Sequence, residues 1–275
     1  MEPTEVDASN AELISQLVLD QSFWAQQKLD GVRLLSVFTE EGISFVGRKR
    51  QPMKSTMVTQ YLPELRERLE KLRDAGHSGS FALDGEMMLD GTYCLFDMVP
   101  DEESRDMPYA ERWRWLSRFV RIINEPTVRR VSTAFAAGEK AELFVKMRDL
   151  GYEGVVFRDS LQTYSQSRTT TVLKAKFTKT ADVVVLDYTR GRNEEGREVG
   201  SATFGVVADK DHYKVLGSCS LIGKPEVKIG DVIEVRYLYW SGSSLVQPRM
   251  MRVRDDKRSA DCTLDQFTTY KREVF

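Results

Sequence analysis

The sequence predicts an α+β protein in which a mixed domain of helices and strands precedes a smaller, almost purely β domain. Helical and strand-like patterns of apolar residues both occur in the first two thirds of the 275-residue chain. Beyond residues 178–180, only strand-like patterns follow. The expected five short strands in the last 95 or so residues suit a small Greek-key barrel of the OB type. We therefore predict domains over residues 1–178 and 179–275.

Each element of the first domain has its own pattern. Residues 11–19 predict a short helix, and alternation of apolar and polar residues from Trp24 to Phe38 indicates strand structure. Apolar residues at helical spacing predict one helix over 56–75, although Pro63 weakens its first part. The remaining expected elements are strands at 80–89 and 92–98, helices at about 108–124 and 139–150, and strands at 153–158 and 171–177.

In the second domain, strands are expected at 182–188, 202–207, 212–217 and 232–239.

The composition of the whole chain excludes several classes of protein. Its 40 Lys+Arg and 42 Asp+Glu residues give a net charge of −2, which argues against coating nucleic acid by bulk charge but permits a local basic face. No apolar run is long enough to cross a membrane, and the N-terminus lacks a signal-peptide pattern, so we expect a cytoplasmic protein.

Metal and disulfide frameworks are not expected from the cysteines and histidines. The three cysteines lie far apart, and the two histidines have different polar surroundings. A disulfide framework, a zinc site and a histidine-based triad are therefore improbable. No phosphate loop or dinucleotide-type glycine fingerprint occurs either, so a nucleotide would have to be held by side chains.

The first candidate for chemistry is the segment Lys28-Leu29-Asp30-Gly31-Val32-Arg33. Its Asp-Gly turn places a lysine at the end of one strand and an arginine at the start of the next. Nearby cations or burial lower the pKa of such a lysine and make its amine a covalent nucleophile. A surface hairpin with ordinary charges is the simpler alternative for this motif taken alone.

Two acidic motifs follow. In a strand, Asp84 and Glu86 share a face, where two carboxylates require a cation, a ribose hydroxyl or a basic residue opposite them. Glu153 leads directly into the apolar strand Val155-Val156-Phe157, and its hard oxygen ligands suit a divalent metal. In isolation, each is more simply explained as an exposed acid at the end of a strand.

Two basic motifs lie nearer the C-terminus. Lys174 and Lys176 project to one face of a strand, about 7 Å apart, which suits an anion such as phosphate. Basic and apolar residues alternate over Arg249–Lys257, after a strongly apolar strand. The alternatives are a solvated basic edge for the lysines and a surface strand of balanced charge for the second segment.

The order of these motifs resembles that of the covalent nucleotidyltransferase superfamily, which contains ATP-dependent DNA ligases, RNA ligases and mRNA capping enzymes. The resemblance spans Lys28 to Lys257, and ATP-dependent DNA ligase is its best fit. It implies a nucleotidyltransferase (adenylation) domain with antiparallel sheets and flanking helices, followed by an OB-fold barrel. With 27 residues before Lys28, we expect the minimal two-domain type found in viruses and bacteria.

The resemblance also implies a reaction. Lys28 would attack the α-phosphate of ATP to form lysyl-AMP, the AMP would pass to a DNA 5′-phosphate, and the 3′-hydroxyl would then displace it. ATP and Mg²⁺ are the expected cofactors, and nicked double-stranded DNA, bound by a monomer, is the expected partner. An RNA ligase or capping-type enzyme is the nearer alternative. A non-catalytic nucleic-acid-binding protein is the more distant one.

Roles for further residues follow from the same resemblance. Asp30 would orient Lys28, and Lys174 and Lys176 would hold the α-phosphate. Glu153 would bind Mg²⁺, with Glu86 on the ribose or metal side. The other implied nucleotide contacts are Arg33 and Arg48 on AMP or the nick phosphate, Phe96 stacked on adenine, Gln26 at the position that reads the base in some relatives, Arg168, and Arg254 and Lys257 on pyrophosphate.

A neutral protein must bind DNA through one-sided basic patches. We nominate the face formed by Arg114, Arg118 and Arg121 on the helix predicted over 108–124. The loop around Arg190 and Arg192, with Arg197 nearby, is the second candidate. Phosphate contacts of this kind position a protein without reading base sequence. The alternative for the helix arginines is that they are solvated partners of neighbouring acids.

Overall fold

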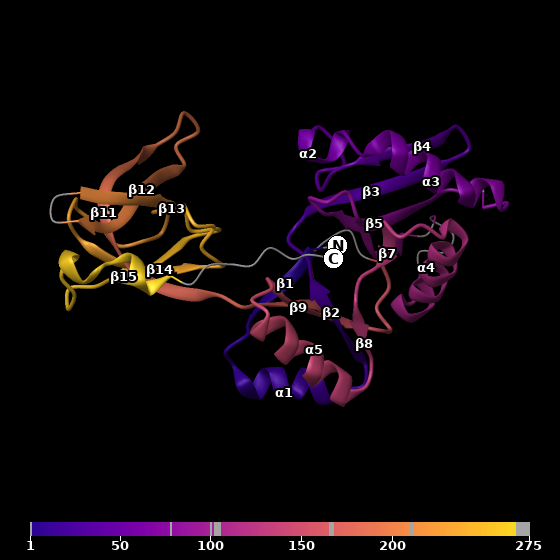
Figure 1. The fold of residues 1–275 in the computed structure, drawn as a ribbon, viewed down its shortest axis with the longest axis horizontal. Helices are drawn as coiled ribbons and strands as arrows, with labels where there is room; N and C mark the ends of the chain where they lie inside the picture. The colour runs from indigo at the N-terminus through magenta and orange to yellow at the C-terminus, as the bar shows by residue number, and fades with distance from the viewer. Residues whose placement is uncertain are drawn as a thin grey trace. The chain divides into compact units, whose positions relative to one another are not determined.

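The computed structural model describes residues 2–77, 79–99, 101, 106–164, 168–209 and 212–267 (Figure 1). Of Glu2 and Arg168, only the backbone is described. The chain divides into two compact units, Met1–Lys176 and Phe177–Phe275. The first unit contains helices and two sheets and the second is almost purely β, which confirms the predicted α+β class.

The first sheet of the first unit combines strands from both ends of that unit. In spatial order its strands are β1 (Glu2–Asp7), β10 (Arg168–Lys176), β9 (Gly154–Asp159), β2 (Phe23–Lys28) and β8 (Thr133–Ala134). Only the β1–β10 pair is parallel. Helices α1 (Ala11–Leu19) and α5 (Ala137–Asp149) lie together on one side of this sheet (Figure 1). Strand β1 was not expected from the sequence.

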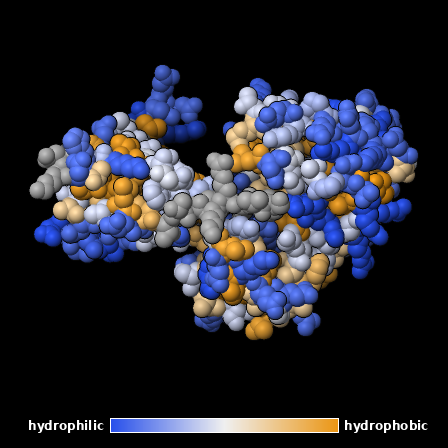
Figure 2. Space-filling view, in the orientation of Figure 1, coloured by the Kyte–Doolittle hydropathy of each residue, from blue (hydrophilic) through white to orange (hydrophobic). Residues whose placement is uncertain are grey.

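The second sheet packs against the other helices. Its strand order is β4 (Gly42–Val46), β3 (Val32–Thr39), β5 (Phe81–Met87), β6 (Tyr93–Val99) and β7 (Val128–Arg130). The helices of this half are α2 (Thr56–Thr59), α3 (Leu62–Asp74) and α4 (Tyr109–Ile123). Leu34, Leu69, Leu83 and Leu116 are fully buried in one core, so α3 and α4 cover the sheet face that carries these strand residues. The space-filling view shows mostly hydrophilic residues over the outer side of these two helices (Figure 2).

The single helix expected over 56–75 is wrong, because the structure has two. Helix α2 ends at Thr59, and α3 begins at Leu62 with Pro63 in its first turn. Proline is tolerated there because the first N–H groups of a helix have no partner within the helix. The apolar spacing of the segment is real, but the proline marks the start of a new helix rather than a weak point within one.

Gly154 and Gly31 allow the backbone to pass very close to neighbouring strands in the first unit. A Cβ atom on Gly154 would lie 2.1 Å from the carbonyl oxygen of Ala175 in β10. A Cβ atom on Gly31 would lie 2.6 Å from the carbonyl oxygen of Met87 and 2.8 Å from the side chain of Glu86. The Glu-Gly and Asp-Gly pairs in the sequence therefore have a packing reason, because no other residue fits at these positions without movement of the backbone.

A buried lysine fixes the start of β2. Lys140 in α5 is fully buried, and its Nζ donates to the carbonyl oxygens of Asp20 at 2.6 Å and Phe23 at 2.9 Å. Burial lowers the pKa of Lys140. These bonds satisfy carbonyl groups between the end of α1 and the start of β2, and so they hold the strand that ends at Lys28.

The second unit is built on one five-stranded antiparallel sheet. Its order is β13 (His212–Ser220), β12 (Glu198–Asp209), β11 (Lys179–Arg192), β14 (Val232–Tyr237) and β15 (Arg249–Val253). Strand β13 also contacts β15, and the backbone N–H of Leu245 donates to Leu216 at 2.8 Å. The sheet thus curls toward closure, as an OB-type barrel requires, with short 3-10 helices at Ser259–Asp261 and Leu264–Gln266.

Strands β11 and β12 are longer than the sequence pattern indicated. They stay paired up to Arg192 and Glu198, so they form an extended hairpin with exposed side chains near its tip.

None of the helices in the described ranges has both the length and the apolar character that crossing a bilayer requires.

Candidate active site

Three charged side chains meet where three strands of the first sheet lie side by side. Gly154 at the start of β9 pairs with Lys28 of β2 on one side and with Lys176 of β10 on the other. Glu153, directly before Gly154, therefore stands between the two lysines. One carboxylate oxygen accepts from Lys28 Nζ, and the other lies 3.2 Å from Lys176 Nζ. The side chain of Glu153 is only 2% exposed, so this carboxylate is satisfied by two ammonium groups.

Lys174 adds a further positive charge beside this group. Its Nζ lies 3.8 Å from Glu5 of β1. Burial lowers the pKa of Lys174, the nearby cations Lys176, Lys28 and Arg48 lower it further, and Glu5 opposes them. An anion such as a phosphate bound beside these lysines would relieve their mutual repulsion.

The second sheet supplies the opposite wall. Arg33 of β3 makes a two-pronged ion pair with buried Asp84 of β5, with distances of 2.9 Å from Nε and 2.5 Å from Nη2. The Arg33 guanidinium lies 5.7 Å from the ring centre of Phe96. Burial raises the pKa of the Glu86 carboxyl to about 8, although Lys28 and Arg33 oppose the shift. Glu86 is thus mostly protonated at neutral pH, and it can donate as well as accept a hydrogen bond.

A cavity lies between the two sheets of the first unit. It is lined by the predicted residues Gln26, Lys28, Arg33, Glu86 and Phe96. Its apolar lining includes Pro3, Leu29, Val156 and Val172. An aromatic ring, apolar side chains and a cationic rim together match a nucleotide, which has a flat base and charged phosphates. The geometry therefore brings together residues that are far apart in the sequence.

The other predicted residues differ in how closely the structure ties them to this cavity. Asp30 follows Lys28 in the connection to β3, and Arg48 stands exposed in the turn after β4, near enough to influence Lys174. The side chain of Arg168 falls outside the described residues. Arg254, which pairs with Asp182 at 2.9 Å, and Lys257 both belong to the second unit, so their part in pyrophosphate release stays a prediction.

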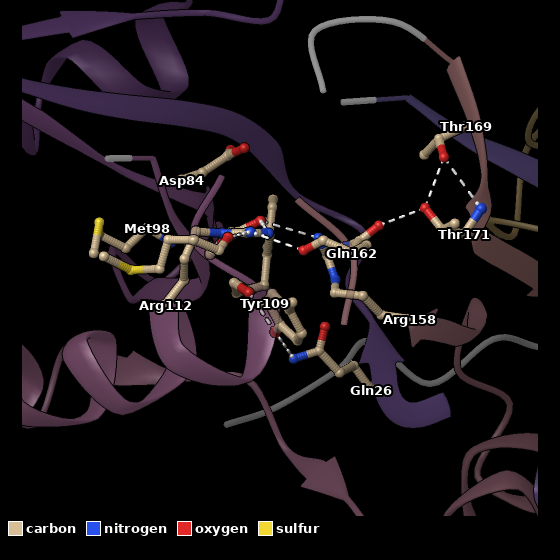
Figure 3. A network of polar contacts seen from close by, with 12 residues as sticks. Gln26, Asp84, Met98, Tyr109, Arg112, Arg158, Gln162, Thr169 and Thr171 are labelled. Carbon is tan, nitrogen blue, oxygen red and sulfur yellow. Dashed lines mark hydrogen bonds and ion pairs between the residues drawn. The ribbon is translucent and has the colours of Figure 1, made fainter. Parts of the chain in front are cut away.

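Sequence reasoning missed a buried ion network at the edge of the cavity. The carboxylate of Asp97 in β6 accepts hydrogen bonds from Nε and Nη2 of Arg112 in α4, at 2.8 and 3.1 Å. It also accepts one from Nη1 of Arg158 in β9, at 3.1 Å (Figure 3). These side chains are 1%, 0% and 7% exposed. Tyr109 of α4 lies beneath the Arg158 guanidinium, 4.6 Å from it to the ring centre. The available signal was an acid and an arginine within apolar strands, since a buried charge requires a partner.

A divalent metal has one suitable ligand here. Among the described residues, no group of three or more acidic, histidine or cysteine side chains is arranged to hold a metal. Glu153 offers hard carboxylate oxygens, but each already binds an ammonium group, so a Mg²⁺ ion there would replace one of the two lysines and take most of its ligands from water and substrate phosphates. The Mg²⁺ site on Glu153 stays a prediction. Glu86 fits a ribose hydroxyl better than a metal, because burial favours its neutral form.

The lysine motif, the two acidic motifs and the paired lysines thus lie in one unit, where Lys28 and Glu86 line the cavity and Glu153 joins Lys28 to Lys176. A profile of the family described as RNA ligase matches residues 21–176, more than half of the chain. The chain belongs to the RNA ligase family. Membership confirms the resemblance to the covalent nucleotidyltransferase superfamily, and the chain is a ligase-type nucleotidyltransferase. A search of curated proteins by sequence finds no match.

Solved structures extend the similarity in fold to both units. A structure named Pmar-Lig_PreS3 is 20% identical with a TM-score of 0.66, and the alignment covers 92% of this chain and 67% of that one. A Lig E DNA ligase is 15% identical with a TM-score of 0.61, over 92% of this chain and 100% of that chain. The ligase domain of LigD from M. tuberculosis is 20% identical with a TM-score of 0.50, over 96% and 98%. This RNA ligase family member therefore has the two-unit ligase fold.

Proposed function

We propose that this protein is an ATP-dependent DNA ligase that acts as a monomer and seals nicks in duplex DNA. The observation that carries the proposal is Lys28, held by Glu153 beside Lys176 at a cavity whose far wall carries Phe96. DNA as the substrate is supported by the second unit. Residues 177–275 lie beyond the family match, and the Lig E DNA ligase shares the fold of almost the whole chain.

The first step forms a bond between Lys28 Nζ and the α-phosphorus of ATP. The Lys28 ammonium loses one proton to solvent, the freed electron pair attacks the phosphorus, and the nitrogen loses a second proton to solvent as the phosphoramidate forms. The bond from that phosphorus to the bridging oxygen breaks, and pyrophosphate leaves with the bond electrons. Lys176 and Lys174 neutralise charge on the phosphate oxygens during this transfer.

The second and third steps pass AMP onward. An oxygen of the DNA 5′-phosphate attacks the lysyl-AMP phosphorus. The phosphoramidate bond breaks as its nitrogen takes up a proton from solvent, which returns the Lys28 amine. The nick 3′-hydroxyl then attacks the activated 5′-phosphate, loses its proton and expels AMP. Asp30 is placed next to Lys28 in sequence, and we assign it the orientation of the amine and later of the 3′-hydroxyl.

Mg²⁺ would be held by Glu153 and by the phosphates of the nucleotide. When bound, the ion supplies neutralisation of phosphate charge. The residues of the chain do the remaining work: Phe96 stacks on the base, Glu86 hydrogen-bonds the ribose, and Arg33 and Arg48 bind AMP or the nick phosphate. Arg33 is oriented for this by its two-pronged pair with Asp84.

An RNA ligase is the second candidate function, and the family profile favours it. The match covers the first unit, which carries the chemistry common to both enzymes. The two functions differ in the strand that is sealed, not in the lysine that is modified. A comparison of nicked DNA with nicked RNA in otherwise identical duplexes therefore decides between them.

The experiment begins with α-labelled ATP and Mg²⁺. We expect one AMP per protein, in an acid-labile and base-stable bond on Lys28. Lys28→Ala should remove the label, and Lys49→Ala, at an exposed lysine, should keep it. A labelled Lys28→Ala protein would contradict the assignment. The wild type should then seal a DNA nick faster than an RNA nick, and the reverse order would establish the second candidate.

A further inference from the structure

We infer that Glu5 of the N-terminal strand competes with nucleotide phosphate for the ammonium group of Lys174 and thereby promotes the release of AMP. The inference rests on the proposed function, because it concerns the nucleotide that reacts with Lys28. Strand β1 lies at the edge of the first sheet and runs parallel to β10, and its register sets Glu5 opposite Lys174. A strand that was not expected from the sequence thus brings an acid to the phosphate-binding lysines.

Glu5 and Lys174 form an ion pair across the two strands. Lys174 Nζ lies 3.8 Å from a carboxylate oxygen of Glu5, and the two side chains are 24% and 29% exposed. The neighbouring Thr4 fixes β1 at this point, because its hydroxyl donates to the carbonyl oxygen of Thr169 at 2.9 Å. Pro3 of the same strand lines the nucleotide cavity. The acid is therefore held at the edge of the site where the phosphates of ATP are expected.

The other carboxylate at this cluster is already engaged. The two oxygens of Glu153 bind Lys28 and Lys176, so Glu153 serves those two lysines and Glu5 serves Lys174. Three cations and one acid act on Lys174, and they are Lys176, Lys28, Arg48 and Glu5. In the free protein, Glu5 thus supplies the negative charge that a bound phosphate would otherwise bring to Lys174.

A phosphate that reaches Lys174 must either displace the Glu5 carboxylate or share the ammonium group with it. Displacement breaks an ion pair, and sharing brings two negative charges together, so both routes weaken phosphate binding. For partly exposed pairs of this kind, the affinity changes by roughly 2- to 6-fold. The proposed third step leaves AMP in the site, and release of a product often limits turnover. A carboxylate that returns to Lys174 favours the departure of AMP.

The test measures the binding of AMP and of adenosine to Glu5→Gln and to the wild type by calorimetric titration at neutral pH. Glutamine keeps the size of the side chain and removes its charge, so AMP should bind the variant roughly 2- to 6-fold more tightly. Adenosine has no phosphate and should bind both proteins equally. Glu12→Gln, at an exposed acid in the first turn of α1, is the control and should bind AMP like the wild type.

Three results would overturn the inference. Unchanged AMP affinity in Glu5→Gln would show that the acid does not compete with phosphate. Weaker AMP binding would show that Glu5 instead serves to keep Lys174 charged. An equal gain with adenosine would trace the effect to the shape of the cavity rather than to charge.

Label transfer from ATP to Lys28 gives a second readout. Glu5→Gln should reach its half-maximal rate at a lower ATP concentration, and AMP should inhibit it at a lower concentration than it inhibits the wild type. Glu5→Asp keeps the charge, so its AMP affinity should lie closer to that of the wild type, and an affinity equal to that of Glu5→Gln would contradict the role of charge. A wild type that neither binds AMP nor becomes labelled would instead overturn the proposed function.

Discussion

The protonation of Glu86 shows how burial sets the chemistry of single residues in this site. Desolvation raises the pKa of its carboxyl to about 8 from 4.5, and Lys28 and Arg33 reverse only part of the shift. The folded protein binds this proton more tightly than the unfolded chain does. Protonation of Glu86 therefore adds to the free energy of unfolding, and this stabilisation is fully present below about pH 4.5 and is lost as the pH rises toward 8. The ionised carboxylate is therefore a cost to the fold in alkaline solution.

Glu86→Gln should remove this pH dependence. A glutamine keeps the shape and stays neutral, so we expect the variant to gain melting temperature relative to the wild type as the pH rises from 6 to 9. The melting temperature of the variant minus that of the wild type should increase by about 3 °C or more over this pH range. Glu142→Gln on the exposed side of α5 is the control, and its difference from wild type should stay constant. A constant difference for Glu86→Gln would contradict the assignment.

Gly154→Ala should destabilise the first unit. The added methyl group would lie 2.1 Å from the carbonyl oxygen of Ala175, and overpacking of this kind costs about 1–3 kcal/mol. Since β9 and β10 must separate, adenylation should fall as well. Gly138→Ala in α5 is the matched control, because its methyl group meets open space and alanine favours the helix by up to about 1 kcal/mol. Urea denaturation of the two variants makes the comparison, and equal midpoints would refute it.

At the scale of elements, the sequence predicted those whose apolar spacing is regular. Helix α1 matches the expected residues 11–19, and α4 and β6 agree within about one residue at each end. Strand β1 has too few apolar residues to show a pattern, because it is an edge strand stabilised by parallel pairing with a strand some 165 residues later. The lengths of β11 and β12 escaped prediction because their exposed ends carry mostly polar side chains and show no pattern of alternating apolar residues.

The outer face of α4 is the element on which DNA binding can be tested. Arg114, Arg118 and Arg121 are all exposed there, on the side opposite buried Leu116. We expect Arg114→Glu with Arg118→Glu to weaken nick binding at moderate salt. Each lost phosphate contact should reduce the salt slope of log affinity by about one unit. Adenylation by ATP should not change. Fluorescence titration at several salt concentrations measures this.

The alternative DNA contact lies on the β11–β12 hairpin. Arg190 donates there to the carbonyl oxygens of Leu221 at 3.0 Å and Lys224 at 2.7 Å, so part of its role is to anchor a neighbouring loop. Arg197 pairs with Glu195 at 3.0 Å. If the α4 double variant keeps its nick affinity and salt slope, the DNA track moves to this hairpin, and Arg192→Glu becomes the next variant to measure.

For the whole molecule, the sequence predicted the central cluster of the candidate site better than its surroundings. Lys28, Glu153 and Lys176 stand in motifs at the ends of strands, and the structure brings the three side chains together, while their catalytic roles stay predictions. The Asp97 network was not predictable, since its two arginines come from α4 and β9, and only tertiary packing brings them to one carboxylate. Likewise, the orientation of the Gln26 amide depends on hydroxyl groups from two other elements.

The division into two units leads to a truncation experiment. Residues 1–178 should fold alone, because this stretch contains both sheets and the cavity lined by Lys28. We expect it to bind AMP but to react with ATP far more slowly, since Arg254 and Lys257 would be missing. It should still seal a nick that already carries AMP, although weakly. Circular dichroism checks folding, and adenylation at the full rate would show that the second unit has no part in that step.

The parallel pairing of β1 with β10 has a consequence for how the protein is made. Strand β1 leaves the ribosome well before its partner β10, and β2 well before its partner β9. Pairings so distant in sequence close slowly, and the partly made chain keeps unpaired strand edges exposed meanwhile. A nascent chain that stops short of Lys174 has neither lysine of β10 and an incomplete first sheet. Translational pausing within the last few dozen codons of this unit should therefore leave chains prone to aggregation, and the ability to bind nucleotide should emerge late in synthesis.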